Sequence, residues 1–222
     1  MVWVAMRKVA LLEPLLMFAF IIAYIWKLRF LCFYLWIAIP ALMILSHVLH
    51  RESPRWLGFE LRGFATGLKN IAPPLIALTV LMFGGGMIFH TIRPIGLTGA
   101  LLALAPYLPW GVVQQYALNG YFLNRLNSGI LASVLFCAAH APNPFLMAVT
   151  LPLAWVATQL YRRNRNLFVL GIAHAVIGWM LFLVAPDSIS HHLRVGPAYR
   201  RFALITIGVP SKLNFSRRRL IR

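Results

Sequence analysis

The chain has 222 residues, of which 61% are hydrophobic and 11% charged, and its formal net charge is +17. Its mean hydropathy is +0.78. A soluble globular protein needs more polar residues than this to cover its surface, so the composition excludes that class and indicates an all-α, polytopic integral membrane protein. Long unbroken apolar runs favour transmembrane helices over a closed β-barrel.

Apolar runs between charged or Pro/Gly-rich breaks predict about seven transmembrane helices, with about six to eight as the range. The first run follows Arg7 and Lys8, but Glu13-Pro14 interrupts it and no cleavage site precedes Lys27, so we expect an uncleaved helix. The fifth run is short and is followed by two prolines, so we expect it to end inside the membrane. The approximate spans are 9–26, 30–49, 70–90, 97–123, 129–141, 145–160 and 167–185.

We expect a single transmembrane domain over residues 1–186 and a basic C-terminal tail over 187–222. The linker 51–69 alternates arginine with aromatic residues, which fits either a helix lying among the lipid headgroups or an ordinary basic loop. Counting Lys and Arg beside the spans puts the N-terminus in the cytoplasm. The basic tail contradicts that orientation, unless the apolar stretch 202–210 enters the membrane or the number of spans differs by one.

The acidic residues are few, and none lies in the middle of the chain; they are Glu13, Glu52, Glu60 and Asp187. The middle instead contains a set of uncharged polar residues within apolar segments, namely Gln114, Gln115, Asn119, His140 and His174. Polar side chains at membrane depth are costly and usually functional. Any buried chemistry at this set must therefore run without a carboxylate.

The spacing of these residues favours a shared site. Gln115 and Asn119 are four residues apart and lie on one helix face, and Phe136 and His140 have the same spacing. With His174, they form three polar patches on three separate helices at comparable depth. We expect the three patches to converge on one cavity.

In order and spacing, these residues resemble the CPBP family of glutamic intramembrane endopeptidases, also called Abi or CAAX-type. The family pattern is Glu-Glu-x-x-x-Arg, then Phe-x-x-x-His, then a further His. Here Gln114 and Gln115 stand at the glutamate positions and Asn119 at the arginine position, whereas Phe136-x-x-x-His140 and His174 match. The resemblance covers about residues 54–185 and implies a CPBP-like helical core.

The resemblance implies hydrolysis of peptide bonds in membrane-associated substrates, with the first glutamate activating a water and the histidines holding that water or the oxyanion. An amide orients water but cannot deprotonate it, so Gln114 is no general base. His140 or His174 could take over this role. The alternative is a catalytically inactive homologue with a binding or regulatory role, in which the same polar side chains hydrogen-bond helices together.

The sequence predicts no cofactor and no metal. A hydrolytic zinc site wants three protein ligands, and the carboxylate that would complete one is missing here. The rival interpretation is haem ligation by His140 and His174. Expected partners are a membrane-embedded or lipidated peptide and anionic lipid headgroups at the basic loops and tail, and no nucleic acid. We expect a multi-pass protein of the cell membrane, of the bacterial inner-membrane type.

Cys32 and Cys137 lie far apart in apolar segments, so we expect neither a disulfide nor a thiolate metal site, and both should be inert core residues. His47 and His90 lie near the ends of predicted spans. We expect both imidazoles to reach toward the headgroups.

Overall fold

A computed structural model describes residues 2–200, with side chains from Leu11 onward. The regular secondary structure of the described residues is entirely helical, with no strands. Two of the longer helices continue through a π-helical turn. In chain order the elements are α1 (Val2–Ala23), η1 (Tyr24–Leu28), α2 (Arg29–Leu31), η2 (Phe33–Ile37), α3 (Ala38–Leu49), α4 (Phe64–Ile88), α5 (Gly96–Gln115), η3 (Tyr116–Leu123), α6 (Asn124–Leu126), α7 (Gly129–Ala138), α8 (Pro144–Arg163), α9 (Leu167–Val184), α10 (Asp187–Ser190) and η4 (His191–Leu193).

Seven apolar helical segments confirm the expected all-α, multi-pass membrane architecture. Five of them are long and apolar enough to cross a membrane, and these are Leu11–Leu31, Phe64–Ile88, Gly96–Leu126, Pro144–Arg163 and Leu167–Val184. Two shorter apolar helices cover Phe33–Leu49 and Gly129–Ala138. The linker 51–63 consists of turns and bends, and α4 begins at Phe64. Of the two interpretations of this segment, the ordinary basic loop is therefore correct, and the helix lying among the headgroups is wrong.

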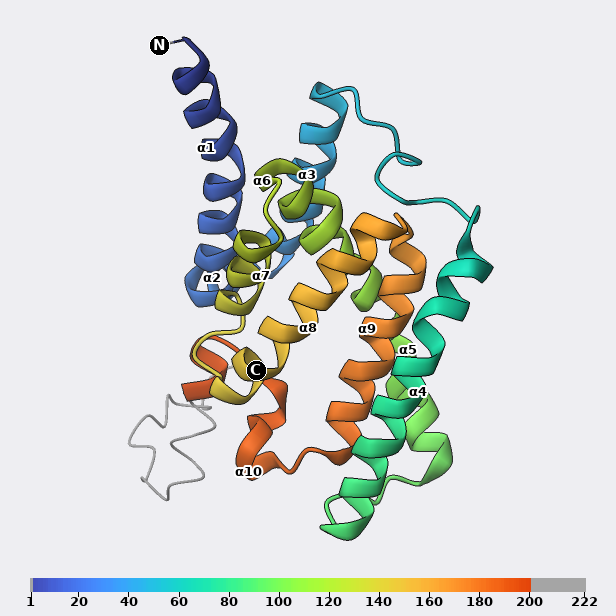
Figure 1. The fold of residues 1–222 in the computed structure, drawn as a ribbon. Helices are drawn as coiled ribbons and strands as arrows, with labels where there is room; N and C mark the ends of the chain where they lie inside the picture. The colour runs from blue at the N-terminus through green and yellow to red at the C-terminus, as the bar shows by residue number, and fades with distance from the viewer. Residues whose placement is uncertain (1, 201–222) are drawn as a thin grey trace, which may run out of the picture.

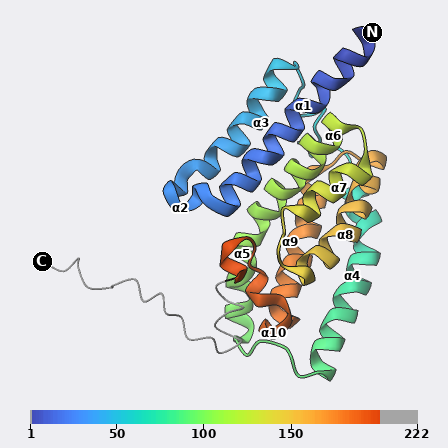
Figure 2. The same cartoon turned by 90° about the vertical axis from the view of Figure 1, so that its left-hand side faces the viewer.

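The helices form two groups around the middle of the chain. α5 packs along α9, which also contacts α4, and α7 packs against α8. α1 and α3 lie side by side on one side of the molecule, with α4 on the opposite side (Figures 1 and 2). The long helix from α5 through α6 runs between these groups and touches both. This helix therefore positions any site that the groups share.

Side-chain caps begin the three helices that follow this long helix. Ser128, Asn143 and Asn166 accept backbone N–H bonds from the residues three positions later, at 3.3, 3.1 and 3.0 Å. Such caps satisfy backbone N–H groups that have no partner at the start of a helix.

α7 has 10 residues and so is about 15 Å long, half the hydrocarbon thickness. As expected, it is too short to cross the membrane.

A buried arginine ties α1 and α3 to this core. The side chain of Arg125 is 8% exposed and donates to Glu52 at 2.7 and 2.8 Å, to Ser46 at 2.8 Å and to Glu13 at 3.2 Å. His47 Nδ1 lies 2.6 Å from Glu52. Burial raises the pKa of Glu52, but the hydrogen bonds from Arg125 and His47 outweigh burial and hold it below the ordinary value of 4.5.

This cluster was not predicted from the sequence, and the expected positions of His47 and Cys32 were wrong. His47 is 3% exposed and paired with Glu52, so it does not reach toward the headgroups, whereas His90 is exposed. Cys32 is exposed, in the turn after α2, so it is no core residue. Cys137 is buried as expected, and its Sγ donates to the Met147 carbonyl at 3.4 Å.

The chain after α9 packs back on the turn before α8. Asn143 Nδ2 donates to the carbonyls of Ser190 and Arg194 at 2.9 and 3.0 Å. Arg93, in the connection between α4 and α5, forms a two-point ion pair with Asp187 and donates to the Phe182 carbonyl. The expected tail therefore starts with residues that contact the helical body. Residues 202–210 lie outside the described part of the chain.

The Arg93–Asp187 pair predicts a small loss of stability in acid. The hydrogen bond from Arg93 lowers the pKa of Asp187 below its ordinary value of 3.8, against the effect of burial. The pair therefore stabilises the fold above the unfolded-state pKa, and this stabilisation is lost as pH falls through the lower, folded-state pKa. Since both side chains are partly exposed, we expect no more than about 1 kcal/mol.

The measurement is the thermal unfolding midpoint in detergent, determined at a series of pH values around and below the ordinary pKa of aspartate, for wild type and for Asp187→Asn. We expect the midpoints of the two proteins to converge at the acidic end of the series. Curves that stay parallel at every pH would show that the pair does not contribute.

Candidate active site

A one-way chain of hydrogen bonds joins three of the five candidate residues. Asn119 Nδ2 donates to Gln115 Oε1 at 2.7 Å. Gln115 Nε2 lies 3.1 Å from His174 Nδ1. Asn119 is 0% and Gln115 3% exposed. The bond between Gln115 and Asn119 confirms that the two side chains share a helix face, and α9 supplies the histidine that meets them.

The amide orientations in the structure assign a tautomer to His174. Gln115 Nε2 faces His174 Nδ1, and because an amide nitrogen only donates, Nδ1 is the acceptor in this orientation. In the neutral imidazole, the proton then lies on Nε2. His174 thus offers an N–H donor at its far nitrogen.

His140 has the opposite tautomer. Its Nδ1 lies 2.8 Å from the Phe136 carbonyl, which can only accept, so Nδ1 bears the proton and Nε2 has a free lone pair. The Phe136 ring contacts both imidazoles, with centroid distances of 5.0 Å to His140 and 6.0 Å to His174. The two histidines are also close enough to interact electrostatically. One offers a proton acceptor and the other a donor.

Gln114 lies next to this chain but outside it. The residue is half-buried, and its Oε1 is buried without a hydrogen-bond partner in the described part of the chain. A buried amide oxygen without a donor is costly, and such groups usually have a functional or solvent explanation. Gln114 therefore has an acceptor available for a water or an N–H group of a bound peptide.

Two glycines bring the helices of the site together. A Cβ at Gly111 on α5 would overlap the Gly171 carbonyl and lie 3.0 Å from Ala175 N, and one at Gly171 on α9 would lie 2.8 Å from Val112 Cα. The helices thus touch through their backbones one turn before Gln115 and three residues before His174. Directly after Gln115 the helix widens into η3, and such π-helical turns occur frequently at functional sites.

Gly111→Ala should therefore separate α5 from α9. The added methyl group meets backbone atoms that cannot rotate away, so we expect a loss of about 1–3 kcal/mol in the free energy of unfolding. Gly84→Ala is the matched control, because nothing lies within 4 Å of the added Cβ and helix propensity favours alanine by about 0.5–1 kcal/mol. Detergent thermal melts test this pair. An unchanged midpoint for Gly111→Ala would contradict the close approach.

The structure thus brings Gln115, Asn119 and His174 into direct contact, and His140 beside them through Phe136. The sequence pointed to Phe136 only through its spacing from His140. Its carbonyl sets the His140 tautomer and its ring contacts both imidazoles. Gly111 and Gly171 were not predicted from the sequence as part of the site. Their positions could have indicated this role, since each glycine lies about one turn before a polar site residue in an apolar helix.

The donors at this site do not make up an ordinary metal centre. Within residues 2–200, no group of three or more His, Cys, Asp or Glu side chains could hold a metal ion. The site offers two imidazoles and three amides. The amides can donate and accept hydrogen bonds, and the imidazoles can in addition accept a proton.

The fold and this geometry define a multi-pass membrane protein with a polar site between apolar helices. Residues 96–180 match the family model described as Type II CAAX prenyl endopeptidase Rce1-like. No curated protein and no solved structure matches the chain. The matched range contains all five candidate residues and agrees with the resemblance to intramembrane proteases; residues 54–95, which we expected in the same core, lie outside it.

Proposed function

We propose that the protein hydrolyses peptide bonds of membrane-associated substrates with a water molecule activated by His140. The observation behind this proposal is the bond from His140 Nδ1 to the Phe136 carbonyl, which leaves a lone pair on His140 Nε2. Gln115 Nε2 faces His174 Nδ1, and in that orientation His174 Nε2 carries the N–H that the second function needs. A general base must accept a proton from water, and an oxyanion must receive a hydrogen bond.

In this mechanism, the water oxygen bonds to the scissile carbonyl carbon while its proton moves to His140 Nε2. The carbonyl oxygen becomes an oxyanion that accepts a hydrogen bond from His174 Nε2–H. The tetrahedral intermediate then breaks its C–N bond, and His140 returns the proton to the leaving nitrogen. The products are a carboxylic acid and an amine, and the histidine is neutral again.

The amides have positioning roles in this scheme. Gln115 holds His174 in the tautomer that donates from Nε2, and Asn119 holds Gln115 in the orientation that does so. Gln114 Oε1 and Asn119 Oδ1 both lack a hydrogen-bond partner in the described residues. Asn119 is already bound to Gln115 through its Nδ2, so in this scheme Gln114 is the amide that contacts the water or the substrate. We assign His140, His174 and Gln114 to the reacting atoms, and Gln115 and Asn119 to their orientation.

The uncharged residues at this site are electrostatically consistent with each other, whether the site is active or not. Where the proteases that the chain resembles have paired glutamates and an arginine, this chain has Gln114, Gln115 and Asn119. A buried arginine without a carboxylate partner would be costly, and here both charges are absent. One alternative is an inactive homologue that binds membrane peptides, in which case the purified protein cleaves no peptide. The other is a haem protein, in which case the purified protein shows a Soret band that His174→Ala removes.

Gln114→Glu tests the mechanism by returning a carboxylate to the site. Because Gln114 Oε1 has no donor in the described structure, a carboxylate there adds a proton acceptor without breaking an existing bond. We expect cleavage to become at least about tenfold faster, toward the 10²- to 10⁴-fold that a general base typically contributes. The assay is cleavage of a fluorogenic transmembrane peptide in nanodiscs, with and without a prenylated C-terminal cysteine.

The matched control is Gln159→Glu, which puts the same change on another half-buried glutamine, on α8. Its rate should equal that of wild type. If Gln114→Glu stays as slow as wild type while its thermal midpoint is unchanged, Gln114 does not face the reacting atoms. If Gln114→Glu melts lower without activity, and Asn119→Arg restores part of that loss, the amides are structural.

A further inference from the structure

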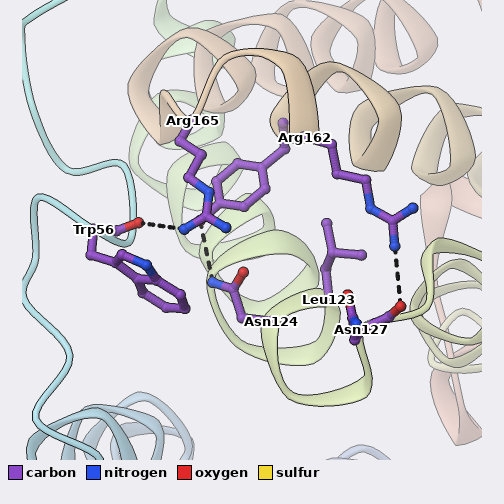
Figure 3. A pocket seen from close by; sticks show the side chains of 7 residues that line it. Trp56, Leu123, Asn124, Asn127, Arg162 and Arg165 are labelled. Carbon is purple, nitrogen blue, oxygen red and sulfur yellow. Dashed lines mark hydrogen bonds between the residues drawn. The ribbon is translucent and has the colours of Figure 1, made fainter.

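A polar pocket lies at the end of the helical bundle, and neither His140 nor His174 lines it. It has a volume of about 210 Å³ and is lined by side chains from three connections: Trp56 between α3 and α4, Asn127 before α7, and Arg162 and Arg165 at the α8–α9 turn. Figure 3 shows the two guanidinium groups on its rim with Asn124 and Leu123 below them. None of the residues that line it is acidic.

Both arginines are held in place by backbone carbonyls. Arg165 Nη1 donates to the Trp56 carbonyl at 3.3 Å, and Arg162 Nη2 donates to the Asn127 carbonyl at 3.2 Å. Arg165 also stacks over the Trp56 indole, 4.6 Å from its centroid. A guanidinium has five N–H donors, so most donors on each group stay available. Two oriented guanidinium groups with free donors form a site for an anion with several oxygens.

The pocket is built on a rigid frame. Tyr161, which is 1% exposed, donates from its hydroxyl to the Leu57 carbonyl at 2.9 Å, and Leu167 N donates to the Gly58 carbonyl at 3.0 Å. These bonds fix the 51–63 linker against the α8–α9 turn. The positions of Trp56 and the arginines relative to one another therefore do not depend on a ligand.

The location of the pocket identifies the source of the anion. Three apolar spans end or begin beside it, at Leu126, Arg163 and Leu167, so it lies at the boundary between hydrocarbon and water. Tryptophan and arginine are enriched at this depth. The pocket is smaller than the roughly 300–1,000 Å³ of sites for drug-sized ligands. It suits a phosphate group with part of a glycerol, with acyl chains outside against the helices.

We propose that this pocket binds the phosphate of an anionic phospholipid. Arg162 and Arg165 donate to the phosphate oxygens, and the Trp56 indole lies at headgroup level beside the glycerol. The proposal goes beyond the peptidase site, because none of the five candidate residues lines the pocket. Bound lipid would add a further contact between the 51–63 linker and the α8–α9 turn.

The test is a titration of detergent-purified, full-length protein with phosphatidylglycerol and, separately, with phosphatidylcholine, monitored by native mass spectrometry. We expect wild type to prefer phosphatidylglycerol. Each basic residue near an anionic lipid contributes about 1 kcal/mol, so Arg162→Gln/Arg165→Gln should lower the affinity for phosphatidylglycerol about 30-fold and leave phosphatidylcholine binding unchanged. Arg162→Lys/Arg165→Lys should recover part of the loss, because it restores charge without the planar fork.

The matched control is Arg62→Gln/Arg163→Gln, which removes two exposed arginines outside the pocket. Its phosphatidylglycerol affinity should stay near that of wild type. Equal losses in both double variants would overturn the site in favour of diffuse surface charge. Thermal melts without lipid show whether each variant is folded. Stabilisation of wild type by inorganic phosphate, with no further effect of phosphatidylglycerol, would overturn the lipid as the ligand.

Discussion

His140→Ala should reduce peptide cleavage about 10²- to 10⁴-fold, because it removes the proposed general base. The free lone pair on His140 Nε2 follows from the bond that Nδ1 makes to the Phe136 carbonyl. No carboxylate contacts this histidine in the described structure to take over the proton. The measurement is the turnover rate of the transmembrane peptide in nanodiscs, with unfolding midpoints determined on the same preparations.

The matched control for this loss is His90→Asn. His90 is exposed and has a positive φ of 53°, which asparagine tolerates. This variant should cleave at the wild-type rate. Wild-type activity that survives in His140→Ala would exclude His140 as the base, even if the fold is intact.

Arg125→Ala should lower the free energy of unfolding by about 3–5 kcal/mol, as expected when one partner of a buried ionic network is removed. The change leaves the Glu13 and Glu52 carboxylates, of which the second is 17% exposed, without their shared cation. These carboxylates come from the first span and from the linker after α3. We therefore expect α1 and α3 to loosen from the core.

Arg163→Ala is the control for Arg125→Ala, because it removes an exposed arginine from the end of α8 and should cost no more than about 0.5 kcal/mol. The double variant Arg125→Ala/Glu52→Gln should recover part of the loss by removing one of the unpaired charges. The measurement is detergent unfolding of all four proteins. Equal midpoints for Arg125→Ala and Arg163→Ala would contradict the proposed role of the cluster.

Hydrophobic patterning predicted the helices well because each span needs a long apolar run. It found all seven apolar segments, including the short α7. It placed the start of α4 six residues too late, since the polar and small residues before Asn70 break the apolar run although they continue the helix. The linker 51–63 was ambiguous, because alternating arginine and aromatic residues also fit an interfacial helix.

The candidate site was only partly predictable, since spacing along one helix does not say which helices meet. Gln115 and Asn119 could be paired from their separation, but the contact of Gln115 with His174 depends on the packing of α5 against α9. The cluster around Arg125 depends in the same way on contacts between residues more than 70 positions apart. Its sequence signal was an arginine at the end of a long apolar run, which usually has a buried partner.

The most direct test of the central claim is a wild-type cleavage reaction in water enriched in ¹⁸O, with the released fragments analysed by mass spectrometry. A water activated by His140 should place ¹⁸O in the new carboxyl group of the N-terminal fragment, and His140→Ala should form almost none of this labelled fragment. Wild-type protein that is folded in nanodiscs but releases no labelled fragment from membrane-anchored peptides, prenylated or not, would contradict the claim.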